Sequence, residues 1–485
     1  MLLLIVVVIA LNFVSLLLSK RVKSARDYMI GGGRIPFFVI ALTMAATQFG
    51  GSSLIGGLQQ GAAMGFWPGI YPVFGMTLAL IGASVIGPKF RAFEGAVTPP
   101  DFIEARYGRS SFLRLYHSVT YILVLLAMST SQIISFAQLA SAFGIPYSAA
   151  VWICSISILL IAMLSGMWGV AVTDALQFGA ILILLPIVGG FSLGTLKTNG
   201  ISLATVVSEP VFASRETFTA FMYSTIPILF GTMFNYDTFT RYQSAMDPRS
   251  VRKAALLGAC ALACTILPIG LMGSAVNRLY FGTADTDVTG VLIANVLPGW
   301  AGSVFAAVVM MALLTSADSF FTSISTSFTR DLYQKVLHVK PLDDKRFMLV
   351  SRLALIAAAI IVSIAATHFT AILKVTYYFS PLTTGVMFAP MIVGVLWKGA
   401  SRRGAMLSVI CGGAIAICHI FGLFIFVDRT LGVMIVGTLT MILFSLIFPD
   451  SEKRRSVRIS SRSFGGNRQK RRWIVQDRHR ACGYG

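Results

Sequence analysis

One apolar segment, Met310–Tyr333, carries a row of oxygen-bearing side chains (MMALLTSADSFFTSISTSFTRDLY). On a helix, residues three or four positions apart lie on the same face. The residues that share one face in this way are Ala312, Thr315, Ser316 and Ser319. The carboxylate of Asp318 lies one position round from them. A hard monovalent cation needs several oxygen ligands, and hydroxyl and carbonyl oxygens supply them without excess negative charge. We therefore predict a sodium site in this segment.

Acidic residues are rare inside the apolar segments. Of the 19 Asp and Glu residues, only Asp174 and Asp318 lie well inside such segments, and Asp237 lies near the cytoplasmic end of another. An aspartate at the centre of a membrane helix costs about 2.5–3.5 kcal/mol on insertion scales. Binding of a cation or a proton would account for both buried residues. A structural aspartate that is protonated, or hydrogen-bonded to a neighbouring helix, is the alternative.

The composition is that of a polytopic membrane protein. Of the 485 residues, 56% are hydrophobic and 12% are charged, whereas soluble domains contain about 25% charged residues. Because a membrane helix needs roughly twenty mostly apolar residues, the sequence predicts about thirteen of them. Their approximate ranges are 2–18, 36–64, 66–87, 112–142, 147–165, 168–194, 217–240, 254–274, 299–329, 347–366, 369–397, 404–426 and 430–448.

Basic residues gather in alternate loops, and this asymmetry predicts the orientation, because cytoplasmic loops are enriched in Lys and Arg. The loop after 217–240, for example, is expected to contain Arg241, Arg249, Arg252 and Lys253. The loops on the opposite side hold only Lys197, Arg215, Arg278 and Arg429. We therefore expect a multi-pass protein of the plasma membrane with its N-terminus outside and its C-terminus in the cytoplasm.

The segment from Pro449 onward differs in composition from the rest of the chain. It is polar and carries many of the basic residues that make up the formal net charge of +20. Such a tail is expected to be disordered and could rest on anionic lipid, at about 1 kcal/mol per basic residue near the surface. Nucleic-acid binding is not expected, because no folded module for reading nucleic acid accompanies the charge.

Two predicted helices contain interruptions. The segment TQFGGSSLIGGLQQG breaks 36–64 with glycines and polar residues, and LFGTMFNYDTF does the same in 217–240. Corresponding broken helices in two halves are typical of inverted-repeat transporters with a binding site near the membrane midplane. The expected organisation is a first span and cytoplasmic loop (1–35), a core (36–397, with halves 36–194 and 217–397), two peripheral spans (398–448) and a basic tail (449–485).

The sequence contains no recognisable catalytic motif. The histidines are scattered, and no H-E-x-x-H, phosphate-binding loop or G-x-S-x-G pattern occurs. Cys260 and Cys264 form a helical pair without a second pair nearby, so a zinc site is not supported. We therefore expect no enzyme activity and no cofactor.

Several of these segments resemble the sodium:solute symporter family. The stretch TSADSFFTSISTSFTRDLY is similar to a signature of that family, and RDYMIGGGRIP, TPPDFIEARYG, GVAVTDALQ and FTRYQSA match in the same order. The matches cover roughly residues 20–400. The resemblance implies an all-α, LeuT-like core of five plus five inverted-repeat helices. It also implies that a sodium gradient drives uptake of a small polar solute.

The resemblance also implies positions for the sites. The main sodium site would use carbonyl and hydroxyl oxygens of Ala46, Phe49, Ala312, Thr315 and Ser316. A possible second sodium or coupling site would use Asp174, Asp318 and Ser319. Solute contacts would come from the broken helices, with the candidates Gln48, Ser52, Ser53 and Asn235. Apart from Arg352 and Lys374, near helix ends, the predicted spans contain no basic side chain.

The sequence thus predicts a Na⁺-coupled symporter that imports a small polar organic solute by alternating access, with Na⁺ as the co-transported ion. A proton-coupled carrier that uses Asp174 or Asp318 is the nearest alternative. A transporter-like sensor or channel that signals through the basic tail is an alternative from a different class. The identity of the solute is left open.

Overall fold

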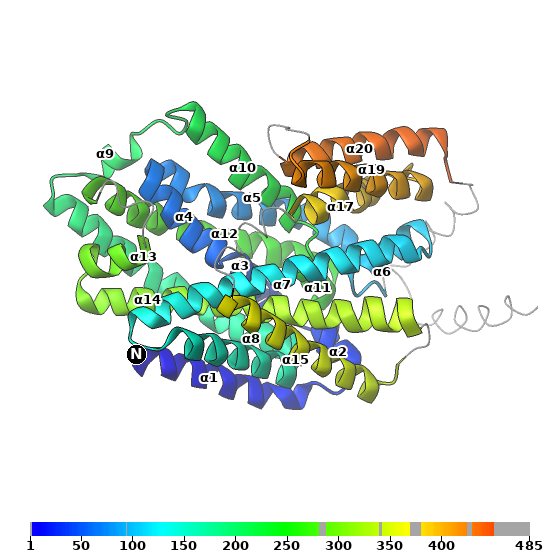
Figure 1. Ribbon diagram of the computed structural model, residues 1–485, viewed down its shortest axis with the longest axis horizontal. Coiled ribbons are helices and arrows are strands. Elements are labelled where there is room, and N and C mark those ends of the chain that lie inside the picture. Colours follow the sequence, from blue (N-terminus) through cyan, green and yellow to red (C-terminus); the bar gives the residue numbers. More distant parts are fainter. Residues whose placement is uncertain are drawn as a thin grey trace, which may run out of the picture.

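The computed structural model describes residues 2–93, 95–280, 288–338, 342–368, 380–423 and 429–450. Within these residues the chain forms helices and no strand, apart from a single bridge between Ile35 and Ala245. Figure 1 shows long helices that run side by side across the molecule. Helices suit a membrane interior because each satisfies its own backbone hydrogen bonds. The basic tail from residue 451 onward lies outside the described residues.

Ten helices of the described residues are long and apolar enough to cross a membrane. Their bounds are Phe66–Arg91 (α5), Ser111–Ser141 (α7), Tyr147–Leu164 and Gly166–Thr198 (both α8), Arg215–Ser244 (α10 and α11), Pro248–Leu279 (α12), Gly299–Leu337 (α14 and its continuation), Asp344–His368 (α15), Arg402–Ile420 (α19) and Arg429–Ile447 (α20). The bent pair α3 (Phe37–Gln48) and α4 (Gly51–Met64) would make an eleventh span.

The count of about thirteen spans is not confirmed and stays a prediction. The first helix, α1 (Leu2–Leu18), has 17 residues. Of the predicted span 369–397, the part 369–379, which includes Lys374, lies outside the described residues, and Pro381–Leu396 is a shorter apolar helix. The division of the chain into domains likewise stays a prediction, as does the orientation of the termini.

The two interrupted helices are present where the sequence predicts them. Helices α3 and α4 meet at an angle of 47°, and Gly50 lies at the junction. A Cβ atom at Gly50 would collide with the side chain of Ser316, so the break permits a close approach to α14 (Gly299–Thr326). The second interruption separates α10 (Arg215–Thr232) from α11 (Tyr236–Ser244).

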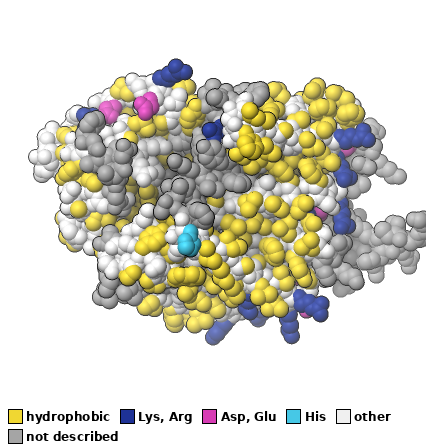
Figure 2. Space-filling model, viewed as in Figure 1, with side chains coloured by type: hydrophobic (Ala, Val, Ile, Leu, Met, Phe, Trp, Pro, Cys, Tyr) yellow, Lys and Arg dark blue, Asp and Glu magenta, His cyan; other side chains and the backbone are white. Residues whose placement is uncertain are grey.

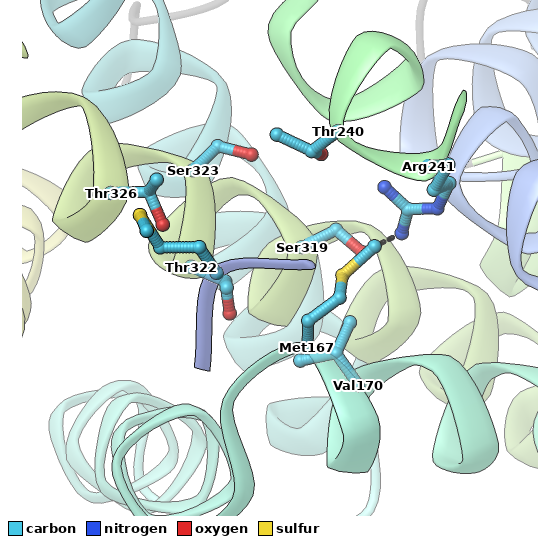
Figure 3. Close-up of a pocket in the computed structure, with 9 residues that line it drawn as sticks. Met167, Val170, Thr240, Arg241, Ser319, Thr322, Ser323 and Thr326 are labelled. Atoms are coloured by element: carbon cyan, nitrogen blue, oxygen red, sulfur yellow. Dashed lines mark hydrogen bonds between the residues drawn. The ribbon is translucent and has the colours of Figure 1, made fainter. Parts of the chain in front are cut away.

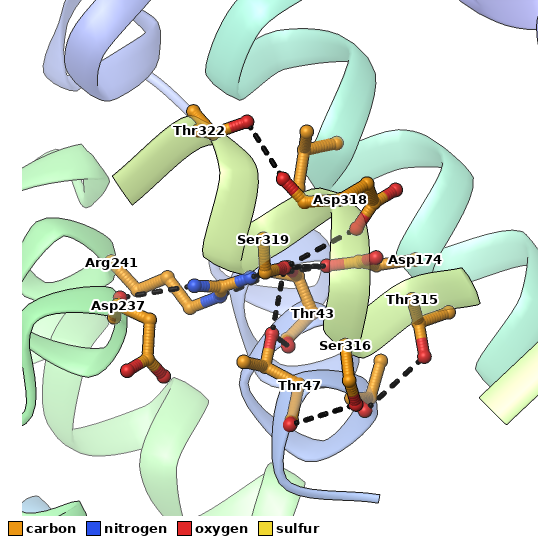
Figure 4. Close-up of polar contacts among 12 residues, drawn as sticks. Thr43, Thr47, Asp174, Asp237, Arg241, Thr315, Ser316, Asp318, Ser319 and Thr322 are labelled. Atoms are coloured by element: carbon orange, nitrogen blue, oxygen red, sulfur yellow. Dashed lines mark hydrogen bonds and ion pairs between the residues drawn. The ribbon is translucent and has the colours of Figure 1, made fainter. Parts of the chain in front are cut away.

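Helix α8 turns sharply at Gly166, which separates its two membrane-crossing parts. Gly166 has a φ of +50°, a conformation that glycine adopts without steric cost. A Cβ atom there would lie 2.7 Å from the ring of Tyr28. The second part of α8 is thereby directed back across the bundle, where it carries Asp174 toward α14 (Figure 4).

Helix α14 forms the centre of the bundle. In its most apolar part 94% of the residues are buried inside the protein, whereas the value for α15 is 39%. The outer helices instead present apolar side chains to the surroundings, and Figure 2 shows these side chains as a broad hydrophobic surface. An apolar surface of this kind fits the hydrocarbon of a bilayer. The polar residues of α14 are therefore kept away from lipid.

A cluster of buried charged side chains links several helices at one end of the bundle. Arg114 of α7 forms ion pairs with Asp101 (2.9 Å), Glu104 (2.7 Å) and Asp331 (2.6 Å). Tyr236 of α11 donates a hydrogen bond to Asp331 (3.1 Å). The cluster joins α6 (Pro99–Tyr107), α7, α11 and the continuation of α14. It ties the two halves of the predicted core together.

The stability of this cluster is expected to depend on pH. Burial raises the pKa of Asp101, but the positive charges of Arg330 and Arg114 outweigh that effect and leave the pKa below its ordinary value. A depressed carboxyl pKa stabilises the folded state above the unfolded-state pKa of about 3.9, and the stabilisation disappears as the pH falls through the folded-state pKa. The difference in melting temperature between wild type and Asp101→Asn should therefore be largest near neutral pH and shrink below about pH 4. A difference that does not change with pH would contradict this prediction.

Candidate functional site

The break between α3 and α4 lies against the middle of α14 (Figure 4). Thr315 donates from Oγ1 to the carbonyl of Ala46 (3.4 Å) and to that of Ala312 (2.9 Å). Ser316 donates from Oγ to the carbonyl of Thr47 (3.2 Å). Both hydroxyl groups belong to fully buried residues. Hydroxyls of α14 thus meet backbone carbonyls at the end of α3, as the predicted main sodium site requires.

Phe49 occupies the end of α3. Its backbone N–H donates to the carbonyls of Ala45 and Ala46 (both 3.0 Å), and its backbone then leaves the helical conformation, with φ −90° and ψ 65°. Its ring packs edge-on against Phe178 of α8, with 5.6 Å between ring centroids. The structure therefore places Phe49 at the interruption, beside the residues that contact α14.

The predicted second set also comes together. Ser319 Oγ lies 3.5 Å from a carboxylate oxygen of Asp174 and 3.5 Å from one of Asp318. Thr43 of α3 donates to the same oxygen of Asp174 (2.5 Å), and the hydroxyls of Thr47 and Ser319 are 3.2 Å apart. Three helices, α3, α8 and α14, therefore contribute oxygen atoms to one buried cluster.

This cluster contains an arginine that the sequence analysis placed in a loop. Arg241 of α11 is 2% exposed and forms an ion pair with Asp174 (3.1 Å). The same guanidinium group donates to Ser319 Oγ (2.7 Å) and to Thr43 Oγ1 (3.0 Å). The assignment of Arg241 to a cytoplasmic loop was therefore wrong, and so was the expectation that the spans contain no basic side chain apart from Arg352 and Lys374.

The physical reason is the length of the span. The structure continues the helical span to Ser244, whereas the predicted span ended at residue 240. A signal for the buried arginine was present in the sequence. Two aspartates, Asp174 and Asp318, lie inside apolar segments, and a buried carboxylate is stable when a cation pairs with it. Arg241 is the basic residue nearest in the sequence to an interruption of a predicted helix.

A cavity of about 360 Å³ lies next to the interruptions of both broken helices. Such a volume suits a small solute. Thr47, Gln48 and Gly50 line it from the first broken helix, and Thr232, Asn235 and Asp237 line it from the second. Ser316 also lines the cavity, so the candidate sodium site and the cavity share a residue.

Two of the four candidate solute-binding residues line this cavity. They are Gln48 and Asn235. Gln48 donates to Asp237 (3.3 Å) and accepts from Thr232 (3.3 Å). Ser53 is not among the lining residues, since it is fully buried and donates to the backbone carbonyls of Gln48 and Gly50 (both 3.0 Å). The side chain of Ser52 lies outside the described residues.

Other lining residues were missed by the sequence analysis. They include Tyr121 and Gln132 of α7, Phe320 of α14 and Thr383 near the C-terminal region of the chain. Gln132 accepts a hydrogen bond from the backbone N–H of Gly51 (3.0 Å), the first residue of α4. No local pattern marks these residues, because only the packing of the helices brings them to one cavity.

A second, much smaller pocket lies beyond Arg241 and Ser319 (Figure 3). At about 10 Å³, it has room for no more than about one water molecule. Hydroxyl groups of Thr322, Ser323 and Thr326 line it from α14. Arg241 and Ser319 thus lie between the sodium-site region and a further row of oxygen atoms along the same helix.

Interrupted helices around a central cavity, with oxygen groups at the interruption, define the class of secondary transporters. The sequence profile of the sodium:solute symporter family matches residues 28–412. The sodium/pantothenate symporter of Escherichia coli (strain K12) is 26% identical over 414 residues, which cover 80% of this chain and 83% of that protein. The osmoregulated proline transporter OpuE of Bacillus subtilis (strain 168) is 25% identical over 84% of this chain and 87% of its own length. The chain belongs to the sodium:solute symporter family.

Solved structures show the same fold. A Na⁺-coupled sialic acid symporter in a substrate-bound outward-open state superposes with a TM-score of 0.79 at 18% identity, over 93% of this chain and 98% of that one. MhsT in complex with L-phenylalanine gives a TM-score of 0.54 at 14% identity, over 84% of this chain and 98% of its own length. These similarities confirm the all-α, LeuT-like fold class.

Family and fold together establish the general activity. The protein is a Na⁺-coupled solute symporter and a multi-pass protein of the plasma membrane. Its relatives are transporters, so the expectations of no enzyme activity and of no cofactor besides the co-transported Na⁺ are confirmed.

Proposed function

We propose that this symporter imports a small polar organic solute and that its main sodium site is formed by Ala46, Phe49, Ala312, Thr315 and Ser316. The observation that carries the proposal is the direct contact between the two hydroxyls of α14 and the carbonyls at the end of α3. Hydroxyl and carbonyl oxygens suit a monovalent cation, because they provide ligands without fixed charge.

Coupling follows from the position of this site. Ser316 belongs both to the proposed sodium site and to the lining of the cavity. A sodium ion shared by α3 and α14 would therefore hold the broken helix in the shape that lines the cavity. Sodium and solute would then raise each other's affinity, as thermodynamic linkage requires. One charge that enters down a potential of 100 mV supplies about 2.3 kcal/mol. That energy could support a solute gradient of about fiftyfold, since 1.4 kcal/mol is tenfold.

Asp174, Asp318 and Ser319 are the candidates for a second coupling site. Asp174 is paired with Arg241, so this set already contains a cation of the protein itself. Asp318 is almost fully buried and has no ion pair among the described residues. This difference is the observation that favours proton coupling. Unlike Asp174, Asp318 could bind and release a proton without first breaking an ion pair with a guanidinium group.

The two coupling modes can be distinguished by transport. Purified protein in proteoliposomes should accumulate solute under an inward sodium gradient, and a pH gradient with potassium in place of sodium should give about a tenth of that rate or less. The solutes tested would be L-proline and pantothenate, because relatives are named as sodium/proline and sodium/pantothenate symporters. Equal uptake under a pH gradient without sodium would favour the proton-coupled alternative and count against the sodium site.

The orientation and the role of the tail complete the proposal. The positive-inside rule supports an outside N-terminus and a cytoplasmic C-terminus. The basic tail, 449–485, would rest on anionic lipid of the inner leaflet. Deletion of residues 451–485 should leave uptake unchanged and reduce binding to anionic vesicles. Loss of uptake on deletion would instead support a signalling or gating role for the tail.

A further inference from the structure

Among the described residues, one charged side chain lines the central cavity. Asp237 is the charged side chain among the described residues that line it, and no lysine, arginine or histidine of those residues does. The other polar groups come from neutral amides and hydroxyls, such as those of Gln48, Gln132 and Thr232. A solute in this cavity would therefore meet a carboxylate, with no basic side chain of the described chain to balance it.

Neutral groups are the partners of this carboxylate. Gln48 Nε2 donates to one carboxylate oxygen of Asp237 (3.3 Å), and Thr238 Oγ1 lies 3.4 Å from the same oxygen. Asp237 has no ion pair with a lysine or arginine within the described part of the chain. The residue is nevertheless buried, at 4% exposed. A buried ion without a counterion costs several kcal/mol, so a cation near Asp237 would stabilise the site.

Arg241 lies one helical turn away but serves other groups. Its Nη1 donates to the backbone carbonyl of Asp237 (3.0 Å), while Nε donates to Thr43 and Nη2 donates to Asp174 and Ser319. Figure 4 shows the carboxylate of Asp237 directed away from the guanidinium group. The positive charge of Arg241 is paired with Asp174. Among the described residues, no other cation lies on the side of Asp237 that faces the cavity.

We propose that the transported solute carries a positively charged nitrogen and that Asp237 binds this nitrogen in the central cavity. The inference rests on the proposed function, because it names the substrate class of that site. Small ammonium compounds, zwitterionic amino acids among them, fit a cavity of about 360 Å³. The rings of Tyr121, Tyr223 and Phe320 line the same cavity, and aromatic faces attract ammonium groups. Purely anionic solutes and neutral sugars lack the group that Asp237 would bind.

The test compares ammonium compounds with isosteres that lack the charge. Thermal unfolding of the purified protein would be followed in NaCl with choline against 3,3-dimethylbutan-1-ol, and with L-proline against tetrahydrofuran-2-carboxylate. The common amino acids, ethanolamine and glycine betaine would complete the ammonium panel, and pantothenate would represent anions. We expect at least one ammonium compound to raise the melting temperature. Its isostere should need at least a tenfold higher concentration for the same shift.

Substitutions then assign the effect to one side chain. Asp237→Asn should weaken the binding of the stabilising ammonium compound at least about tenfold, since loss of one partner of a buried charge pair is costly. Asp237→Glu keeps the charge and should keep the preference for the ammonium compound over its isostere. The matched control is Glu216→Gln, which removes an exposed carboxylate from the start of the same span and should leave binding unchanged.

Three results would overturn the inference. They are stabilisation by no ammonium compound of the panel, equal stabilisation by the isosteres or pantothenate, and unchanged affinity in Asp237→Asn. Failure of the proposed function has a different signature. In that case NaCl would not stabilise the wild-type protein relative to KCl in the absence of any solute.

Discussion

Changing Thr315 and Ser316 together to alanine is expected to weaken sodium binding about a hundredfold or more. Each hydroxyl would supply one oxygen to the ion, and a hydrogen-bond-scale interaction with a charged group contributes about 1.5–3 kcal/mol. Loss of two such interactions exceeds about 2.7 kcal/mol, which is a hundredfold in affinity. The substitutions also remove the contacts to the carbonyls of Ala46 and Thr47. Sodium-driven uptake should fall with the affinity.

The measurement is the melting temperature as a function of NaCl concentration, with KCl at equal ionic strength as reference. The matched control is Thr326→Ala with Ser327→Ala, which removes two buried hydroxyls of the same polypeptide segment. That pair lies 11 residues further on, about 16 Å along a helix, and should leave the sodium dependence intact. If the Thr315/Ser316 double variant and the wild type respond equally to sodium, the main site is wrongly assigned.

Replacement of Arg241 by methionine is expected to destabilise the folded protein by about 3–5 kcal/mol. Methionine fills a similar volume but leaves the carboxylate of Asp174 buried without its cation, and that uncompensated charge is the source of the cost. Arg241 also donates hydrogen bonds to the hydroxyl oxygens of Thr43 and Ser319, and the substitution would remove these bonds as well. Thermal or denaturant unfolding in detergent would show the loss.

A second substitution tests the reason for this loss. Asp174→Asn combined with Arg241→Met removes both charges, so the double variant should be more stable than Arg241→Met alone. Arg215→Met removes an exposed arginine from the start of the same span and should change stability by no more than about 0.5 kcal/mol. If Asp174→Asn does not recover stability, the ion pair is not what makes Arg241 important.

The position of the ion pair bears on the number of ions transported. Asp174, Ser319 and Arg241 form one hydrogen-bonded unit at the place where the resemblance implied a second sodium. A guanidinium group there supplies the positive charge that an ion would otherwise bring. The sodium dependence of uptake in Asp174→Asn therefore tests the second site separately from the main one. An unchanged rate and Hill coefficient would make Asp174 a structural residue.

The contact between α3 and α14 that the proposed main site requires could be predicted from the sequence, because its signal is local. The spacing of Thr315 and Ser316 on an apolar helix, and the glycines that interrupt 36–64, are visible in the order of the residues. The family resemblance implied that these two segments contact each other, and in the structure Thr315 does donate a hydrogen bond to the carbonyl of Ala46. Helical periodicity and glycine punctuation are properties of a short stretch of chain. These properties do not depend on how the rest of the chain packs.

The partners of the buried charges could not be predicted in this way. Whether Arg241 lies in a loop or in a membrane helix depends on four further residues of helix, in an element that packs against α5, α3 and α14. Asp237 likewise changed from a residue near a helix end to the charged group of the cavity. Ser53, a candidate that the family resemblance implied, turns its hydroxyl to the backbone at the break. The direction of a side chain is set by helix rotation, which a sequence of apolar residues leaves free.

Residue patterns alone predict a helical membrane protein with an oxygen-rich face on 310–333 and two interrupted helices, and the family resemblance adds the transporter class. Composition and periodicity suffice for the helical membrane fold, because the bilayer allows few alternatives to a helix. The packing of the helices determines which charges meet. It paired Asp174 with Arg241 and left Asp237 facing the cavity, because a buried charge is positioned by partners that lie far away in the chain.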